Sequence, residues 1–165
     1  MTLEELSAHL QRECYQPNAY HVGSNWSGCS DSYCIDRVGE KFAIFYVERG
    51  KRDDPVHCYE TEEEACDAFL AELDRDRFSR AHCVGIFTTQ SQADALALWL
   101  DSVGITFHRD AILFSSPSDY RHRVFVFGRD KIRMQELIDR GSGPGIVSLL
   151  KSLTSWKNWR WLFRK

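Results

Sequence analysis

Carboxylate side chains are concentrated in one short stretch of the sequence. Seven acidic residues fall within fifteen positions, namely Asp53, Asp54, Glu60, Glu62, Glu63, Glu64 and Asp67. Such a group can bind the arginine and lysine side chains of a basic protein and cover the surface with which that protein holds phosphate. The same residues also suit a solvent-exposed helix face, because carboxylates stabilise the positive end of a helix. Both interpretations stay open at the level of sequence.

Two further charged residues, Glu48 and Arg49, follow an apolar run at Phe42–Val47. Side chains at the end of a strand are often exposed and available for binding. A local ion pair between them would instead only shape the turn, and an exposed pair contributes little stability. Glu48 and Arg49 therefore join the candidate partner-binding residues, with a local structural role as the alternative.

Residue types that bind metal or act as nucleophiles are present but poorly spaced. Cys29, Cys34, His57 and Cys58 offer four zinc ligands, yet the first gap is loose for a zinc site. Adjacent residues of an extended chain point to opposite faces, which separates His57 from Cys58. No phosphate-binding loop, dinucleotide fingerprint, nucleophile elbow or paired-histidine motif occurs. We therefore expect no metal site, no cofactor and no enzymatic activity.

The six cysteines belong to a chain whose start, Met-Thr-Leu-Glu-Glu-Leu, is acidic and amphipathic, unlike a signal peptide. We therefore expect a cytoplasmic protein. Cysteines stay reduced in that compartment and behave as small buried hydrophobic residues. No apolar run reaches the length of a membrane span.

The elements that position the acidic stretch are well specified. Phe42–Val47 is aromatic and β-branched, as expected of a strand, and the glycine, charges and proline of residues 48–55 predict a turn. Val56–Tyr59 has the length of a brief second strand. Thr61 and Glu64 form a predicted capping box, with the Thr61 hydroxyl on the Glu64 amide and the Glu64 carboxylate on the Thr61 amide. Apolar residues then recur at helical spacing at Ala65, Phe69 and Leu73.

The residues before this stretch predict a helix and a small meander. Thr2 and Glu5 can cap a first helix, which Pro17 and Asn18 terminate. Short strands are expected at Tyr20–Val22 and Tyr33–Asp36, joined by a polar loop. The apolar face of the helix consists of Leu3, Leu6 and Leu10.

Residues 1–75 resemble small immunity proteins of bacterial polymorphic-toxin systems of the contact-dependent inhibition type. The resemblance rests on the strand ending in Tyr-Val-Glu-Arg-Gly and on the helix start Thr-Glu-Glu-Glu-Ala-Cys. It extends to Leu3, Leu6, Leu10, Tyr20 and Tyr33-Cys34-Ile35. It implies a protein that neutralises a cognate toxin, such as a nuclease, by stoichiometric occlusion in the cytosol. The acidic residues would meet the toxin, with aromatic anchors such as Tyr46 or Trp26.

A second module is predicted after a charged hinge at Asp74–Arg77, which divides the chain into residues 1–76 and 77–165. Its expected order is β-α-β-β-α. The corresponding segments are a strand at Cys83–Thr88, a helix from Ser91 to Gly104, strands at Ile105–Phe114 and His122–Phe127, and a helix at Arg129–Arg140. The fold class is therefore α+β, with two small modules that each pack a short, mainly antiparallel sheet against helices.

The two halves carry opposite charge. Residues 1–76 have 17 Asp and Glu against 7 Lys and Arg, a net charge of −10, whereas residues 77–165 have 7 against 14, a net charge of +7. The last segment, Ile146–Lys165, interleaves tryptophans with basic residues and is predicted to be a short helix with a frayed end. This pattern suggests an alternative function as a nucleic-acid or anionic membrane-surface binding module. Its tryptophans would otherwise pack on the domain while its bases stay in water.

Overall fold

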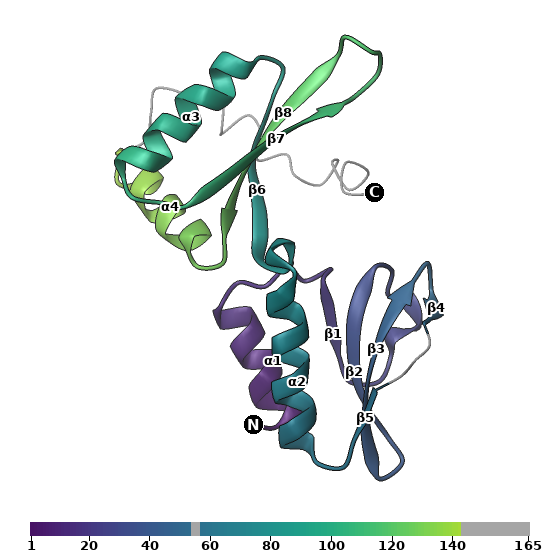
Figure 1. The fold of residues 1–165 in the computed structure, drawn as a ribbon. Helices are drawn as coiled ribbons and strands as arrows, with labels where there is room; N and C mark the ends of the chain where they lie inside the picture. The colour runs from purple at the N-terminus through teal and green to yellow at the C-terminus, as the bar shows by residue number, and fades with distance from the viewer. Residues whose placement is uncertain (54–56, 143–165) are drawn as a thin grey trace. The chain divides into compact units, whose positions relative to one another are not determined.

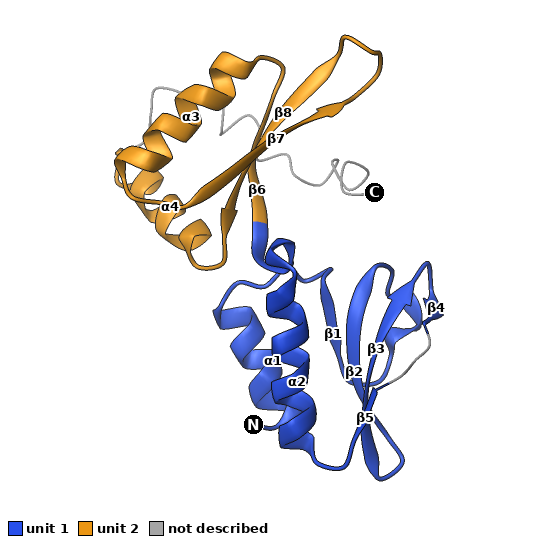
Figure 2. Cartoon of the chain, in the orientation of Figure 1, with its two compact units in different colours: residues 1–81 blue, residues 82–165 orange. Residues whose placement is uncertain are grey.

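The computed structural model of the 165-residue chain describes residues 1–53 and 57–142. The chain has an α+β fold, as predicted, and divides into two compact units, Met1–Ala81 and His82–Lys165 (Figures 1 and 2). The predicted hinge at Asp74–Arg77 forms the end of α2 (Glu62–Arg75) and the start of a 3-10 turn, η2 (Arg77–Arg80). The predicted C-terminal helix lies outside the described residues.

The sheet of unit 1 is mixed. Its strands run in the order β1 (Tyr20–Val22), β2 (Ser32–Val38), β3 (Lys41–Glu48) and β4 (Lys51–Arg52), and β5 (His57–Tyr59) pairs with the first half of β3. β1 is parallel to β2, and the other pairs are antiparallel. β2 extends beyond its predicted bounds at both ends.

The predicted turn over residues 48–55 contains β4, which the sequence did not predict. Lys51 and Arg52 pair with the end of β3 around a tight turn formed by Arg49 and Gly50. Both turn residues have positive φ, 52° and 77°, which is the backbone of a two-residue hairpin that glycine favours. Arg49 therefore serves first as a turn residue.

The β2–β3 hairpin places alternate side chains on two faces. Tyr33 pairs with Tyr46 and Ile35 with Ile44, so these residues share one face. The other face carries Cys34, Ala43, Phe45 and Val47, against which Trp26 packs from the 3-10 turn η1 (Trp26–Gly28). The Trp26 ring meets the Phe45 ring edge-on at 5.2 Å between centroids, so this predicted anchor contributes to intrachain packing.

Two helices, α1 (Leu3–Arg12) and α2, cover the first face of the sheet (Figure 1). Their apolar positions have the helical spacing seen in the sequence. The core of unit 1 consists of Leu6, Leu10, Tyr15, Ile35, Ile44, Ala65, Cys66, Phe69 and Leu73. α1 ends at Arg12, earlier than Pro17 suggested.

Unit 2 has the predicted β-α-β-β-α order. The elements are β6 (Ala81–Phe87), α3 (Gln90–Ser102), β7 (Phe107–Leu113), β8 (Tyr120–Phe127) and α4 (Asp130–Asp139), with β8 in the centre of the sheet. The core consists of Val84, Phe87, Ala93, Leu96, Leu100, Ile105, Val124, Val126 and Met134. α3 ends before Gly104, whose φ of 65° suits a residue that terminates a helix.

Candidate functional site

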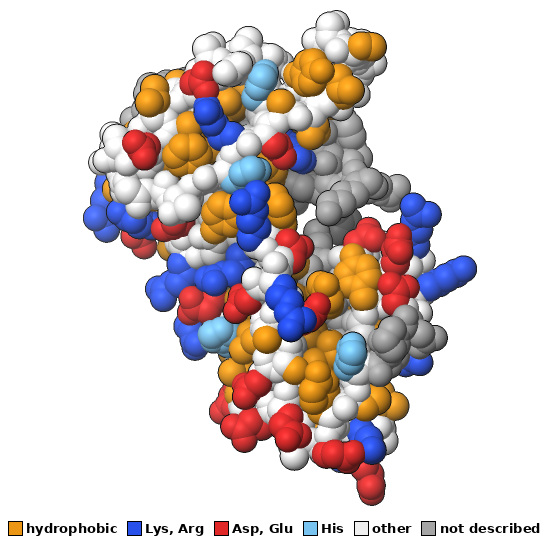
Figure 3. All heavy atoms as spheres, viewed as in Figure 1, with side chains coloured by type: hydrophobic (Ala, Val, Ile, Leu, Met, Phe, Trp, Pro, Cys, Tyr) orange, Lys and Arg blue, Asp and Glu red, His pale blue; other side chains and the backbone are white. Residues whose placement is uncertain are grey.

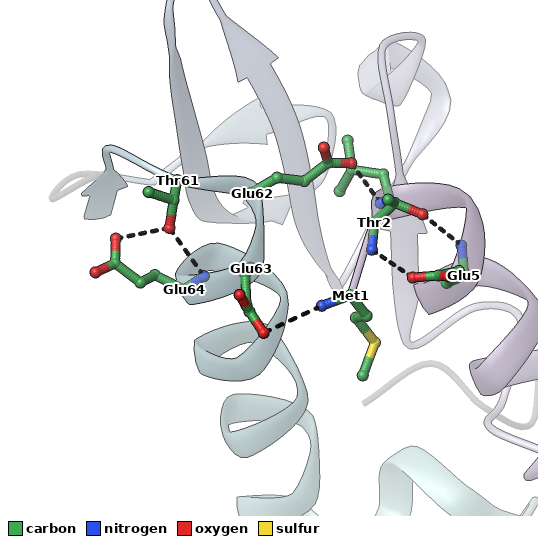
Figure 4. A network of polar contacts seen from close by, with 8 residues as sticks. Met1, Thr2, Glu5, Thr61, Glu62, Glu63 and Glu64 are labelled. Carbon is green, nitrogen blue, oxygen red and sulfur yellow. Dashed lines mark hydrogen bonds and ion pairs between the residues drawn. The ribbon is translucent and has the colours of Figure 1, made fainter.

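The first acidic residues of α2 bind the start of the chain (Figure 4). The Glu62 carboxylate accepts a hydrogen bond from the backbone N–H of Leu3 at 2.6 Å. The Glu63 carboxylate lies 3.9 Å from the amino group of Met1. The Glu62 hydrogen bond therefore helps to hold α1 against α2, which is a structural role, whereas the Glu63 ion pair is long and exposed and contributes little stability.

Thr61 caps α2, but the predicted capping box is only half formed. The Thr61 hydroxyl accepts a hydrogen bond from the Glu64 N–H at 3.3 Å, as predicted. The Glu64 carboxylate accepts a hydrogen bond from the Thr61 hydroxyl at 2.9 Å, instead of one from the Thr61 amide (Figure 4). Both bonds of a capping box form at α1 between Thr2 and Glu5, at 2.9 and 3.2 Å.

Glu60 is another predicted acid that has an intrachain partner. Glu60 forms an exposed ion pair with Lys41 at 2.5 Å across the β3–β5 edge. Such exposed pairs contribute little to stability. Asp54 lies outside the described residues.

The remaining predicted acids, Glu48, Asp53 and Asp67, are exposed. Within the described part of the chain, their carboxylates form no hydrogen bond or ion pair. Glu48 ends β3 and Asp53 follows β4, where the Asp53 N–H donates to the Tyr46 carbonyl at 2.9 Å. The β3–β4 hairpin thus brings these two carboxylates to the side of Tyr46. Asp67 lies apart from them on α2.

Tyr46 packs against Tyr33 on the helix-covered face of the sheet. Their ring centroids are 5.0 Å apart at an angle of 65°, an edge-to-face contact, and both side chains are half-buried. Burial raises the pKa of both hydroxyls. Nearby carboxylates add to this increase in pKa, chiefly Glu72 for Tyr33 and Asp31 for Tyr46. The tyrosine pair therefore lies in a negative environment.

A hollow of about 180 Å³ opens beside the tyrosine pair. Its lining consists of Ala19, Asp31, Tyr33, Tyr46, Asp76 and Ser79. Figure 3 shows acidic side chains next to hydrophobic ones at the end of the unit 1 sheet where β3 and β4 meet, with basic side chains at its edge. The β3–β4 hairpin also carries the exposed Arg49, Lys51 and Arg52. Unit 1 therefore presents an aromatic surface with carboxylates beside it and basic side chains at the tip of the hairpin.

Local backbone structure fixes the lining of the hollow. Asp31 precedes β2 with a φ of 57°, a left-handed conformation that Asp tolerates better than most residues. Asp76 ends α2 and begins η2, where its carboxylate accepts a hydrogen bond from the Phe78 N–H at 2.8 Å. The buried Ser79 hydroxyl donates to the Leu73 carbonyl at 2.8 Å, which ties η2 to the end of α2.

The sequence analysis named Tyr46 but missed Asp31, Tyr33 and Asp76 as site residues. Asp76 was assigned to a hinge, and Asp31 to a loop. The pairing of Tyr33 with Tyr46 follows from the hairpin register, which the turn at Gly39 could have indicated. The contribution of Asp76 depends on the fold of η2, for which the sequence offers no pattern.

The cysteines and histidine considered as metal ligands do not form one group: Cys29 packs beside Cys34, and His57 and Cys58 are neighbours on β5. Cys34 is buried and Cys29 half-buried, whereas His57 and Cys58 lie exposed on β5. Burial, reinforced by Cys29, raises the pKa of the Cys34 thiol to about 12. Across residues 1–53 and 57–142, no group of three or more His, Cys, Asp or Glu side chains is arranged to hold a metal ion.

Comparisons with protein-family models, curated proteins and solved structures found no match to this chain. In the part of the chain that the structure describes, no helix combines the length and the apolar composition that crossing a membrane requires.

Proposed function

We propose that the protein is an immunity protein, which binds a cognate bacterial toxin in the cytoplasm and neutralises it by stoichiometric occlusion. The observation that carries this proposal is the aromatic surface of unit 1, where Glu48 and Asp53 stand exposed beside Tyr33 and Tyr46. Tyrosines often anchor protein interfaces, and unpaired carboxylates at the rim attract a basic partner. A nuclease-type toxin, which must hold phosphate, offers such a basic surface.

The charge distribution supports a basic partner. Counted by unit, residues 1–81 have 17 acidic against 9 basic residues, a net charge of −8. A field of this sign speeds the approach of a positively charged protein and matters less to the lifetime of the complex. Glu62 and Glu63 contribute to the field although they also bind the start of α1.

The alternative function, binding nucleic acid or an anionic membrane through the basic half, is supported by fewer residues. Residues 82–142 carry 7 acidic and 7 basic residues and are therefore neutral overall. The positive charge of the second half derives from Arg77, Arg80 and five residues beyond 142. An electrostatic footprint for a polyanion would thus be restricted to a short segment.

The test is binding and protection against the product of the neighbouring open reading frame. A charge-reversal variant, Glu48→Lys with Asp53→Lys and Asp67→Lys, should slow association and weaken protection. None of the three carboxylates has an intrachain partner in the described residues, so folding should be unaffected. The matched control reverses Asp101, Glu136 and Asp139 in unit 2, which changes the net charge equally.

The loss of association rate should shrink as salt is added, because screening shortens the reach of exposed charges to about 8 Å at physiological ionic strength. Equal protection by the wild type and the unit 1 variant would contradict the proposed surface. Failure of the wild-type protein to co-purify with the neighbouring gene product, or to protect a cell that expresses it, would contradict the immunity function itself.

A further inference from the structure

The hollow beside the tyrosine pair has the composition of a cation site. Two carboxylates, Asp31 and Asp76, lie in its lining together with the Tyr33 and Tyr46 rings. Tyrosine faces attract cations through the ring quadrupole, and an accompanying carboxylate adds direct charge attraction. The lining residues include no basic side chain.

The end of α2 adds to the negative potential at this point. Asp76 is the C-cap of α2, so the helix terminus that carries partial negative charge lies at the hollow. The nearest cation on that helix is Arg75, whose guanidinium is ion-paired with Glu72 on the adjacent turn. Arg75 still lowers the pKa of Tyr33, but the combined carboxylates and burial outweigh it.

Unit 1 already contains the same chemistry with its cation in place. The Arg80 guanidinium lies 5.0 Å from the centroid of the Tyr15 ring. The Tyr15 hydroxyl donates to the Asp74 carboxylate at 2.5 Å. Tyr15 thus has both an arginine over its ring and a carboxylate beside it. Tyr33 and Tyr46 have the carboxylates, and neither ring is in a cation–π contact within the described residues.

We propose that the hollow lined by Tyr33, Tyr46, Asp31 and Asp76 binds the guanidinium group of an arginine side chain of the partner protein, an inference that rests on the proposed function. A planar guanidinium can lie against an aromatic ring while its N–H groups donate to carboxylates on either side. A volume of about 180 Å³ accommodates the planar end of one arginine but not a large side-chain cluster. The hollow would therefore receive one arginine of the toxin surface.

The probe is N-acetyl-L-argininamide, followed through the NMR signals of the Tyr33 and Tyr46 rings in the full chain. Saturable shifts are expected for this probe. The citrulline analogue has nearly the same shape but no charge, and it should produce no saturable shift at the same concentrations. Equal shifts with both compounds, or none with the arginine compound, would overturn the inference.

The variant is Asp31→Asn with Asp76→Asn, which should weaken arginine binding roughly tenfold because each lost charge contact is worth a factor of a few. Asn tolerates the left-handed backbone of residue 31, and its amide oxygen can still accept the Phe78 N–H at residue 76. The matched control is Glu4→Gln with Glu40→Gln, which removes two exposed charges elsewhere on unit 1. Unchanged affinity in the first variant, or equal loss in the control, would refute the site.

The toxin assay separates this inference from the proposed function. If the toxin binds the wild-type protein and the Asp31 and Asp76 variant equally tightly, the hollow does not receive an arginine of the toxin, but the immunity function stands. If the arginine compound binds as expected while the chain binds no toxin, the hollow is a cation site and the immunity function fails.

Discussion

Hydroxyl groups at the helix starts are the residue-scale features with the clearest energetic consequence. Thr61 satisfies the Glu64 N–H, one of the backbone donors that the first turn of a helix leaves unpaired. Thr61→Ala should therefore lower the free energy of unfolding by about 1 kcal/mol. Denaturant midpoints for the two proteins measure the change. Thr106→Ala is the matched control, because Thr106 is exposed and caps no helix.

A midpoint that shifts equally in the Thr61 and Thr106 variants would show that the cap contributes nothing specific. Toxin binding at saturating protein should be unchanged in both, because Thr61 and Glu64 point their polar atoms at each other (Figure 4).

Burial should divide the cysteines into those that react slowly with a thiol reagent and those that react fast. It raises the pKa of Cys34 to about 12, that of Cys83 to about 11, and that of Cys66 above its usual value. The thiolate is the reactive form, so a raised pKa keeps these three thiols protonated and inert at pH 8. Cys58 is exposed and should react first.

A thiol reagent applied to the native protein at pH 8 should modify Cys58 rapidly and Cys34, Cys66 and Cys83 slowly. Raising the pH to 9 should leave Cys34 and Cys83 slow, because their pKa values of about 12 and about 11 lie well above 9. In denaturant without reductant, all six should react. Fast modification of Cys34 in the native protein would contradict its burial, and fewer than six reactive thiols after unfolding would contradict the reduced state.

Packing of a strand on a helix gives a prediction at the scale of elements. Gly85 lies in β6, where an added Cβ would overlap the Phe87 ring and approach the Leu96 Cδ2 of α3 at 3.1 Å. Gly85→Ala should therefore destabilise unit 2 by about 1–3 kcal/mol through overpacking. The matched control is Gly28→Ala, which meets no atom within 4 Å. Equal stability of the two variants in thermal unfolding would contradict the close approach of β6 and α3.

Elements with a strong local pattern could be predicted from the sequence. The strand at Phe42–Val47, the Thr61-capped helix and the order of elements in unit 2 follow from periodicity, capping and turn residues. β4 was missed because a strand of two residues has no periodicity, and the parallel pairing of β1 with β2 depends on contacts that no local pattern specifies.

The candidate site was harder to predict from the sequence, because it also depends on contacts between segments that no local pattern specifies. The acidic stretch was visible as composition, but hydrogen bonds from the chain start and from Thr61 engage Glu62 and Glu64. The exposed carboxylates that share a surface come from separate segments, the β3–β4 hairpin, the loop before β2 and the end of α2. Only tertiary structure brings such residues together.

At the scale of the whole molecule, the charge is separated along the chain. Unit 1 has a net charge of −8, residues 82–142 have no net charge, and residues 143–165 have 5 basic and no acidic residues. The acidic surface and the basic segment therefore belong to different parts of the sequence and can be altered independently. A variant of the acidic surface should change only the binding that the acidic surface provides, and a variant of the basic segment only the binding that the basic segment provides.

Neutralising the basic segment tests whether toxin binding uses the acidic surface of unit 1 or the basic segment. Lys157, Arg160, Arg164 and Lys165, which lie outside the described residues, are changed together to Gln. Under the proposed function, this variant should protect against the toxin as well as the wild type does, because the proposed surface lies on unit 1. Its association with the basic toxin should be equal or faster, since four repelling charges are removed.

The same variant should lose any affinity for single-stranded nucleic acid or anionic vesicles, because phosphate contacts supply most of such binding and vanish with the charges. Titrations against the toxin and against a generic polyanion at two salt concentrations measure both effects. The acid-reversal variant of Glu48, Asp53 and Asp67 serves as the reciprocal control and should weaken toxin binding only. If that variant protects normally while the neutralised segment abolishes protection, the working surface is the basic segment, and the assignment of toxin binding to unit 1 is wrong.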